Sequence, residues 1–163
     1  MLLTFKFSYP FPVNSIIIIG TEPPCPRCKL LTQVVSVKVK ELGINAEVRH
    51  LVYTDEESRA FAEGLGLETG TASIVAKRMK VEIDNSRKII PNFDSEFNTE
   101  YEDYFFTNWS YELDEHLRIF ENTAKKVGIL MTPSLIINGA LKHSGSVPRF
   151  SQIEEWLLEL KEA

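Results

Sequence analysis

The apolar positions first become regular at residues 16–19, an uninterrupted run of four isoleucines. A run without alternation predicts a strand that is buried on both faces, as strands inside a parallel sheet are. Gly20 and the prolines at positions 23 and 24 end this strand. A second strand is predicted over residues 46–53, after a turn at residues 43–45.

Residues 26–42 carry two periodicities at once. Valines at 35, 37 and 39 alternate with polar residues as in a strand, whereas Leu31, Val34, Val35 and Leu42 keep the spacing of a helix. The order of the elements decides between them, because two parallel strands need a crossover connection and this is usually a helix. A helix over residues 26–42 is therefore predicted.

The C-terminal third has clearer patterns. Residues 110–127 place apolar side chains on one helical face, and Gly128 follows as a stop signal. A short strand over 134–137, the turn pair Asn138-Gly139 and a strand over 140–143 form a predicted hairpin. The last helix follows Pro148, with Ser151 and Glu154 as a capping box.

The order strand, helix, strand and then helix, hairpin, helix predicts an α/β fold with a mixed four-stranded sheet. Between the two halves, residues 54–64 read as a helix capped by Thr54 and Glu57. Residues 71–90 fit either a helix or a hairpin that turns at 84–86. The insertion at residues 54–110 is interpreted as a subdomain within a single domain of residues 1–163.

Charge and aromatic residues distinguish the end of this insertion. Residues 94–121 contain nine acidic residues and one basic residue, Arg118, and aromatic side chains are interleaved with them. The pattern fits a cap that packs its rings on the domain and exposes its charge to water. It also fits a lid or docking surface that selects a basic or apolar partner protein.

Composition and charge argue against a nucleic-acid-binding, a membrane-spanning or a secreted protein. The formal net charge is −5 and no basic cluster occurs, which argues against nucleic acid as a partner. No stretch approaches the ~20 apolar residues of a membrane span. The first residues, with Lys6 followed by Ser8, Pro10 and Pro12, do not read as a secretory signal. A cytoplasmic protein is expected, and its cysteines are then reactive rather than structural.

Cys25 and Cys28 are the two cysteines of the chain, and they lie where the first strand turns into the first helix. Unpaired amide groups and the positive dipole end of a helix favour a thiolate at this position. Cys25 is the predicted attacking thiolate, activated by the helix N-terminus and Arg27, and Cys28 the thiol that resolves a mixed disulfide. Pro26 suits the first helical turn, where its missing N–H costs nothing.

Other roles for the two thiols stay open. A structural zinc site needs four Cys or His ligands, and His50, His116 and His143 show no ligand spacing, so zinc would have to be shared across a dimer. Two inert buried thiols are a further alternative. The proline and arginine between the cysteines indicate a surface turn instead.

The chain resembles the thioredoxin superfamily, and within it the small redox-active disulfide proteins of glutaredoxin-like size. Residues 20–52, with the Cys-Pro-Arg-Cys site, and residues 125–160, with Thr132-Pro133 and Asn138-Gly139, carry the resemblance. It implies a thioredoxin-like fold, a mixed four-stranded sheet flanked by helices, with a mostly helical insertion before the strand that follows a cis proline. Pro133 would be that proline, opposite the cysteine pair, and the backbone of Thr132 would be free to pair with an extended substrate segment.

The chain also departs from the family pattern. Pro24 stands where thioredoxin has a tryptophan before its cysteines, and Pro26-Arg27 replaces Gly-Pro, so the redox potential is not transferable. We find no clear counterpart of thioredoxin's buried aspartate in the sequence. Proton transfer would then fall to solvent or to another group, for which Glu22 is a candidate.

The leading hypothesis is a cytoplasmic thiol–disulfide oxidoreductase of cell redox homeostasis. It needs no cofactor besides a redox-active Cys25–Cys28 disulfide, and its partners are protein disulfides and a recycling reductant. The alternatives are dithiol capture of a metal and a partner-docking module in which the insertion does the main task. The sequence does not indicate an oligomeric state.

Overall fold

Residues 13–162 are described by a computed structural model, so the prediction about a secretory signal at the N-terminus lies outside the described residues. Strand β1 (Asn14–Gly20) is central in a four-stranded sheet of order β2-β1-β5-β6. It pairs in parallel with β2 (Ala46–Val52) and antiparallel with β5 (Ser134–Ile137). The edge strand β6 (Ala140–Ser144) pairs antiparallel with β5. The predicted mixed sheet is confirmed.

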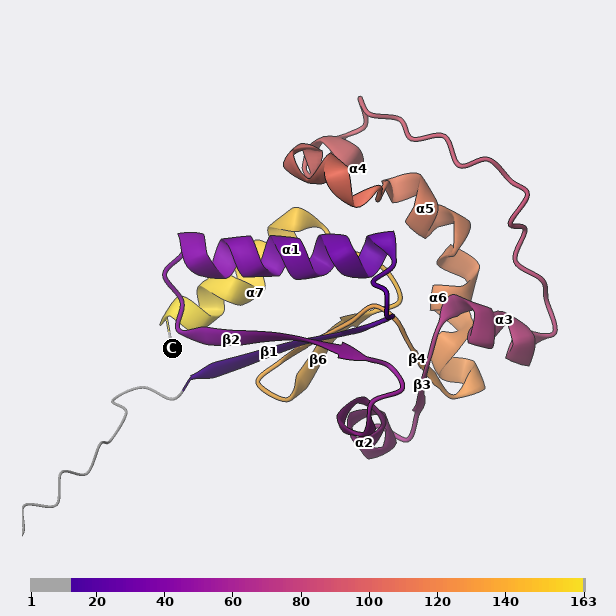
Figure 1. Ribbon diagram of the computed structural model, residues 1–163, viewed down its shortest axis with the longest axis horizontal. Coiled ribbons are helices and arrows are strands. Elements are labelled where there is room, and N and C mark those ends of the chain that lie inside the picture. Colours follow the sequence, from indigo (N-terminus) through magenta and orange to yellow (C-terminus); the bar gives the residue numbers. More distant parts are fainter. Residues whose placement is uncertain (1–12, 163) are drawn as a thin grey trace, which may run out of the picture.

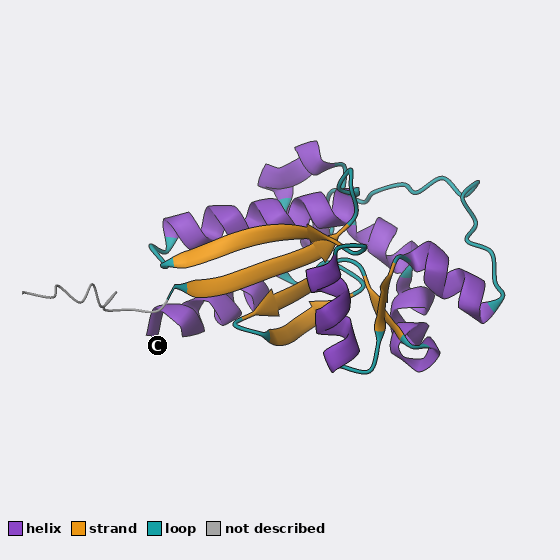
Figure 2. Cartoon of the chain, turned by 60° about the horizontal axis from the view of Figure 1, so that its bottom comes forward, coloured by secondary structure: helices purple, strands orange, loops and turns teal. Residues whose placement is uncertain are grey.

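Helices cover both faces of this sheet. The long α1 (Pro26–Glu41) is the crossover between β1 and β2 that the parallel pair requires. It packs on the same face as the C-terminal α7 (Phe150–Glu162), whereas α2 (Glu56–Gly64) covers the opposite face (Figures 1 and 2). The doubly covered β1 explains why its isoleucine run does not alternate with polar residues.

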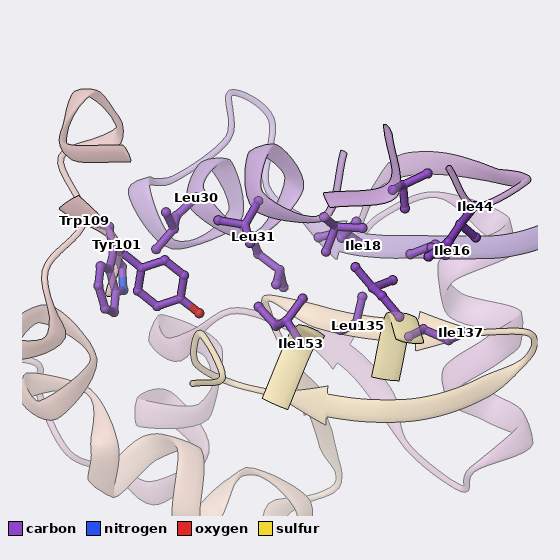
Figure 3. Close-up of a cluster of buried hydrophobic side chains, with 14 residues drawn as sticks. Ile16, Ile18, Leu30, Leu31, Ile44, Tyr101, Trp109, Leu135, Ile137 and Ile153 are labelled. Atoms are coloured by element: carbon purple, nitrogen blue, oxygen red, sulfur yellow. The ribbon is translucent and has the colours of Figure 1, made fainter. Parts of the chain in front are cut away.

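The largest apolar cluster lies between the sheet and the pair α1 and α7. Ile16 and Ile18 of β1 meet Leu30 and Leu31 of α1 there, and each of these side chains is fully buried. Tyr101 and Trp109, which belong to the segment before α5, close one end of the cluster (Figure 3). Part of the aromatic residues between 93 and 111 therefore packs on the domain, as the cap interpretation expects.

A smaller layer extends the fold beyond the four-stranded sheet. Strands β3 (Glu68–Gly70) and β4 (Ile129–Met131) form a parallel two-stranded sheet. Helices α3 (Ala72–Met79) and α6 (Arg118–Ala124) contribute Val75 and Phe120 to the apolar cluster beside it. Between α3 and α5, the chain forms α4 (Glu96–Thr99) and the 3₁₀ helix η1 (Glu102–Thr107). Residues 71–90 thus begin as a helix and continue as a loop, without the alternative hairpin.

One predicted helix is divided in the structure. Instead of a continuous helix over residues 110–127, the chain forms α5 (Tyr111–His116), α6 and the 3₁₀ turn η2 (Lys125–Val127), with a break at Leu117. The two halves bury different neighbours: α5 turns Asp114 inward, and α6 turns Phe120 and Ala124 against α3. Gly128 ends this region with a φ of 82°, as predicted.

Both predicted capping boxes are wrong because tertiary partners take their place. Asp55 stands at the start of α2, and Glu57 binds Arg49 of β2 with a distance of 2.9 Å between Oε1 and Nη1. Helix α7 begins at Phe150, so Ser151 lies inside its first turn. The backbone N–H of Phe150 donates instead to Glu100 Oε1 at 3.2 Å, a cap supplied from another part of the chain.

Candidate functional site

Cys25 caps the N-terminus of α1, and Cys28 lies in the first turn of that helix. The backbone of Cys25 is extended, with φ −67° and ψ 163°, and its Sγ accepts the backbone N–H of Cys28 at 3.4 Å. Thr21 holds the preceding turn, since its Oγ1 accepts the N–H of Cys25 and donates to the carbonyl of Pro23, both at 2.9 Å. The predicted placement of a thiol at the strand-to-helix turn is present in the structure.

The two thiols have unequal environments. Cys25 is partly exposed, whereas Cys28 is fully buried, and their Sγ atoms lie 3.0 Å apart. The hydrogen bond from Cys28 lowers the pKa of Cys25 to about 6, against the opposing effect of burial and with smaller help from backbone N–H groups and Arg27. The same hydrogen bond, together with burial, raises the pKa of Cys28 far above its ordinary value. At neutral pH, Cys25 is therefore the thiolate and Cys28 the proton donor.

Arg27 lies in the protein interior and not on the surface turn that the sequence indicated. The residue is 5% exposed, and its Nη2 donates to the carbonyls of Thr132, at 2.9 Å, and Gly145. Its Nε lies 2.9 Å from Asp114 Oδ1 in an ion pair whose N–H is not aligned for a hydrogen bond. Arg27 contributes less to the thiolate of Cys25 than Cys28 does, and most of its contacts join α1 to the segments around Thr132 and Gly145.

Asp114 is a buried carboxylate that sequence reasoning missed. Its Oδ2 accepts the indole N–H of Trp109 at 2.9 Å and the backbone N–H of Val147 at 3.0 Å. Burial raises the pKa of Asp114, and Arg27 and these two donors oppose that shift. Its position three residues before Leu117, beside the apolar face of the predicted helix, was the available signal, but the sequence does not identify Arg27 as its partner.

The Thr132–Pro133 peptide bond is cis, and so is the Glu22–Pro23 bond in the turn before Cys25. The expectation that the backbone of Thr132 is free is wrong. Its N–H donates to the carbonyl of Gly70 at 2.9 Å, and its carbonyl accepts Arg27. The inserted strand β3 thereby continues its pairing with β4 to the residue before Pro133, and both backbone groups of Thr132 are engaged within the chain.

The remaining candidates lie in different places. Glu22 is exposed and forms no hydrogen bond to either thiol. His143 lies 2.7 Å from Ser146 Oγ through its Nε2, and His116 lies 3.0 Å from the carbonyl of Asp84, both outside the thiol pair. Across residues 13–162, no group of three or more His, Cys, Asp or Glu side chains is arranged to hold a metal ion.

His50 showed no ligand spacing in the sequence, and the structure places its ring close to Cys28. A Cβ atom on Gly20 would lie 2.7 Å from Cys28 Sγ and 2.8 Å from His50 Nε2, so both atoms border the space left by that glycine. The absence of a side chain at the end of β1 is what admits both groups.

Comparison with known proteins identifies one relationship. A family model described as a thioredoxin domain matches residues 107–158. This stretch contains Pro133 and the hairpin β5–β6, but not the two cysteines. No curated protein and no solved structure matches the chain. Within the described residues, none of the helices has the length and apolar character needed to cross a membrane.

Proposed function

Since the chain belongs to the thioredoxin superfamily, we propose that it is a thiol–disulfide oxidoreductase that reduces or exchanges protein disulfides through Cys25 and Cys28. The observation that carries the proposal is the pairing of a partly exposed thiol at a helix N-terminus with a buried thiol 3.0 Å behind it. Their pKa values are shifted in opposite directions, which supports Cys25 as the attacking thiolate and Cys28 as the resolving thiol.

The reaction proceeds by two exchanges of sulfur. The Cys25 thiolate attacks one sulfur of the substrate disulfide, forms a mixed disulfide and releases the first substrate thiolate. Cys28 then attacks Cys25 Sγ, forms the Cys25–Cys28 disulfide and releases the second substrate thiolate. The substrate gains two electrons and the protein loses two, and an external thiol or dithiol reductant restores the reduced pair. A reducing, cytoplasmic setting suits this cycle.

Two serine variants test the proposal with a disulfide-bonded protein as substrate. Cys25→Ser removes the nucleophile and is expected to abolish the reaction. Cys28→Ser leaves the first exchange intact and is expected to accumulate a mixed disulfide that gel electrophoresis without reductant detects. Retained turnover in Cys25→Ser would contradict the proposal, and so would two thiols that never oxidise in graded redox buffers.

A second role has support in the inserted segment. The side chains of Phe93, Phe105 and Phe106 are 55%, 42% and 59% exposed, and Phe93 and Phe105 meet edge to face. The exposed carboxylates of Asp94, Glu102 and Asp103 lie on the same segment. Apolar rings beside exposed acidic groups suit a basic protein substrate, so this surface would select substrates for the thiol pair.

A further inference from the structure

The resolving step of the proposed reaction has an unmet chemical requirement. Cys28 has to lose a proton before its sulfur attacks the mixed disulfide, because the thiolate and not the thiol is the nucleophile. The Cys28 side chain is completely buried, so bulk water does not reach it to remove that proton. A protein group that accepts the proton is therefore needed close to Cys28 Sγ.

His50 lies in the right place to be that group. It pairs with Ile18 in the parallel register of β1 and β2, which directs its side chain to the sheet face covered by α1. Its Nε2 and the Sγ of Cys28 approach the same point above Gly20, at 2.8 Å and 2.7 Å. An ordinary side chain at position 20 would fill the space into which both atoms project.

The ring of His50 is also chemically available. Its Nε2 is shielded from solvent and has no hydrogen-bond partner within residues 13–162. A buried polar atom left without a partner is costly, and such an atom calls for an explanation. His50 as a whole is only partly buried, so part of this residue is accessible to solvent although its Nε2 is not.

Two other acidic or basic side chains, those of Asp114 and His143, already interact with other groups. The Oδ2 atom of Asp114 accepts Trp109 and Val147, and its Oδ1 atom forms the ion pair with Arg27, so both oxygens of this carboxylate interact with groups other than Cys28. His143 binds Ser146, away from the thiol pair. These contacts leave His50 as the group that is both unpartnered and adjacent to Cys28.

We propose that His50 Nε2 accepts the proton of Cys28 during resolution of the mixed disulfide. This inference rests on the proposed function. The Cys28 S–H bond breaks, the proton passes to the imidazole ring, and the sulfur electron pair forms the bond to Cys25 Sγ. The Cys25–substrate sulfur bond breaks at the same time, and the substrate leaves as a thiolate. Solvent then removes the proton from the ring.

Formation of the mixed disulfide changes the acceptor that is available to the Cys28 S–H group. In the reduced protein, Cys28 donates to the Cys25 thiolate, and no hydrogen bond joins Cys28 to His50. Once Cys25 is part of a mixed disulfide, its sulfur carries no charge and accepts hydrogen bonds weakly. The S–H bond is then free to rotate about Cβ–Sγ toward the unpartnered Nε2 of His50.

A two-phase assay separates this step from the first one. Reduced protein is mixed in a stopped-flow spectrophotometer with an aromatic disulfide, and the absorbance of the released aromatic thiolate is followed. Cys25 releases the first equivalent of thiolate, and Cys28 releases the second. Because the protein turns over once, no recycling reductant is needed. His50→Gln keeps a polar side chain of similar length without a strong base, and His116→Gln is the matched control on α5.

We expect His50→Gln to keep the first phase and to slow the second about a hundredfold, the size of a general-base contribution. His116→Gln should keep both phases. An unchanged second phase in His50→Gln would overturn the role of His50 while the proposed function stands. Equal slowing of both phases would overturn it as well, since a packing defect acts on both steps. If wild-type protein releases no thiolate, the proposed function itself fails.

Discussion

Arg27 and Asp114 form a buried ion pair, with Nε and Oδ1 2.9 Å apart, between the first turn of α1 and helix α5. Arg27 stands between Cys25 and Cys28 in the sequence, and its side chain turns into the protein interior. Through Arg27 the pair also reaches the carbonyl of Thr132. Trp109, helix α5 and the cysteine helix α1 thus share one buried polar network.

Asp114→Asn should destabilise the protein by about 3–5 kcal/mol, because it leaves the Arg27 charge buried without a counter-charge. Urea unfolding followed by circular dichroism measures the loss. Asp103→Asn, an exposed acid of the same segment, is the control and should change the free energy of unfolding by less than ~0.5 kcal/mol. A double variant, Arg27→Met with Asp114→Leu, should recover part of the loss. Equal stability of the two asparagine variants would exclude a structural role of the pair.

The rate of Cys25 alkylation should follow a titration with a midpoint near pH 6, the pKa of this thiol. Reactivity is expected to be full above that pH, where the thiolate prevails, and to fall as the pH drops below it. Iodoacetamide labelling read by mass spectrometry measures the profile. A midpoint near 9.0, the ordinary value, would show that the hydrogen bond from Cys28 does not act on Cys25.

Two substitutions of Cys28 test the cause of this low pKa. Cys28→Ala removes the donor with the largest lowering effect, so the alkylation midpoint of Cys25 should rise. Cys28→Ser keeps a hydroxyl donor and should raise it less. A midpoint that stays near pH 6 in Cys28→Ala would assign the shift to the backbone N–H groups and the helix N-terminus instead.

The reduction potential of the pair should lie above the ~−270 mV of thioredoxin and at or below the ~−120 mV of a strong oxidant. The Cys25 thiolate exists only in the reduced protein, so every contact that lowers its pKa favours the dithiol over the disulfide. Titration in glutathione buffers with thiol alkylation gives the value. A potential below −270 mV would mean that the disulfide state is stabilised by contacts absent from the reduced protein.

Gly20→Ala should destabilise the protein by about 1–3 kcal/mol, because the new Cβ would lie 2.7 Å from Cys28 Sγ and 2.9 Å from Cys28 Cβ. Thermal unfolding monitors the change. Gly64→Ala is the matched control at the end of α2, where a Cβ meets nothing within 4 Å, and it should be neutral or stabilising. Equal unfolding temperatures in the two variants would show that the space above Gly20 is larger than the structure indicates.

Replacing Phe105 and Phe106 with serine should slow the reduction of a basic disulfide-bonded protein about tenfold while leaving a small aromatic disulfide unaffected. The rings are exposed, so their loss removes a docking surface without opening the core. Ile119→Ser, which alters an exposed apolar side chain on α6, is the control. Equal rates with the protein substrate would overturn the docking role.

Most of the regular structure was predictable because local signals and topology agreed. The isoleucine run, the Asn138-Gly139 turn and the strand-to-helix position of Cys25 each follow from short-range rules of chain geometry. The failures involve competition from distant groups. Arg49 takes the carboxylate of Glu57 away from its predicted cap. The divided helix buries different faces in its two halves, because α6 packs against α3 whereas α5 directs Asp114 toward Arg27.

The sequence by itself determined the order of the strands and helices of the four-stranded sheet layer, the α/β class and the position of the thiols at the start of α1. Only the tertiary structure decided what surrounds the thiols. It buries the side chain of Arg27, pairs it with Asp114, and brings His50 close to Cys28 above Gly20. Periodicity reports which face of an element is apolar, and a sequence carries that information locally. The neighbours of a buried charge or of a buried imidazole are set by packing between segments that lie far apart in the chain. Short-range sequence patterns do not predict such contacts.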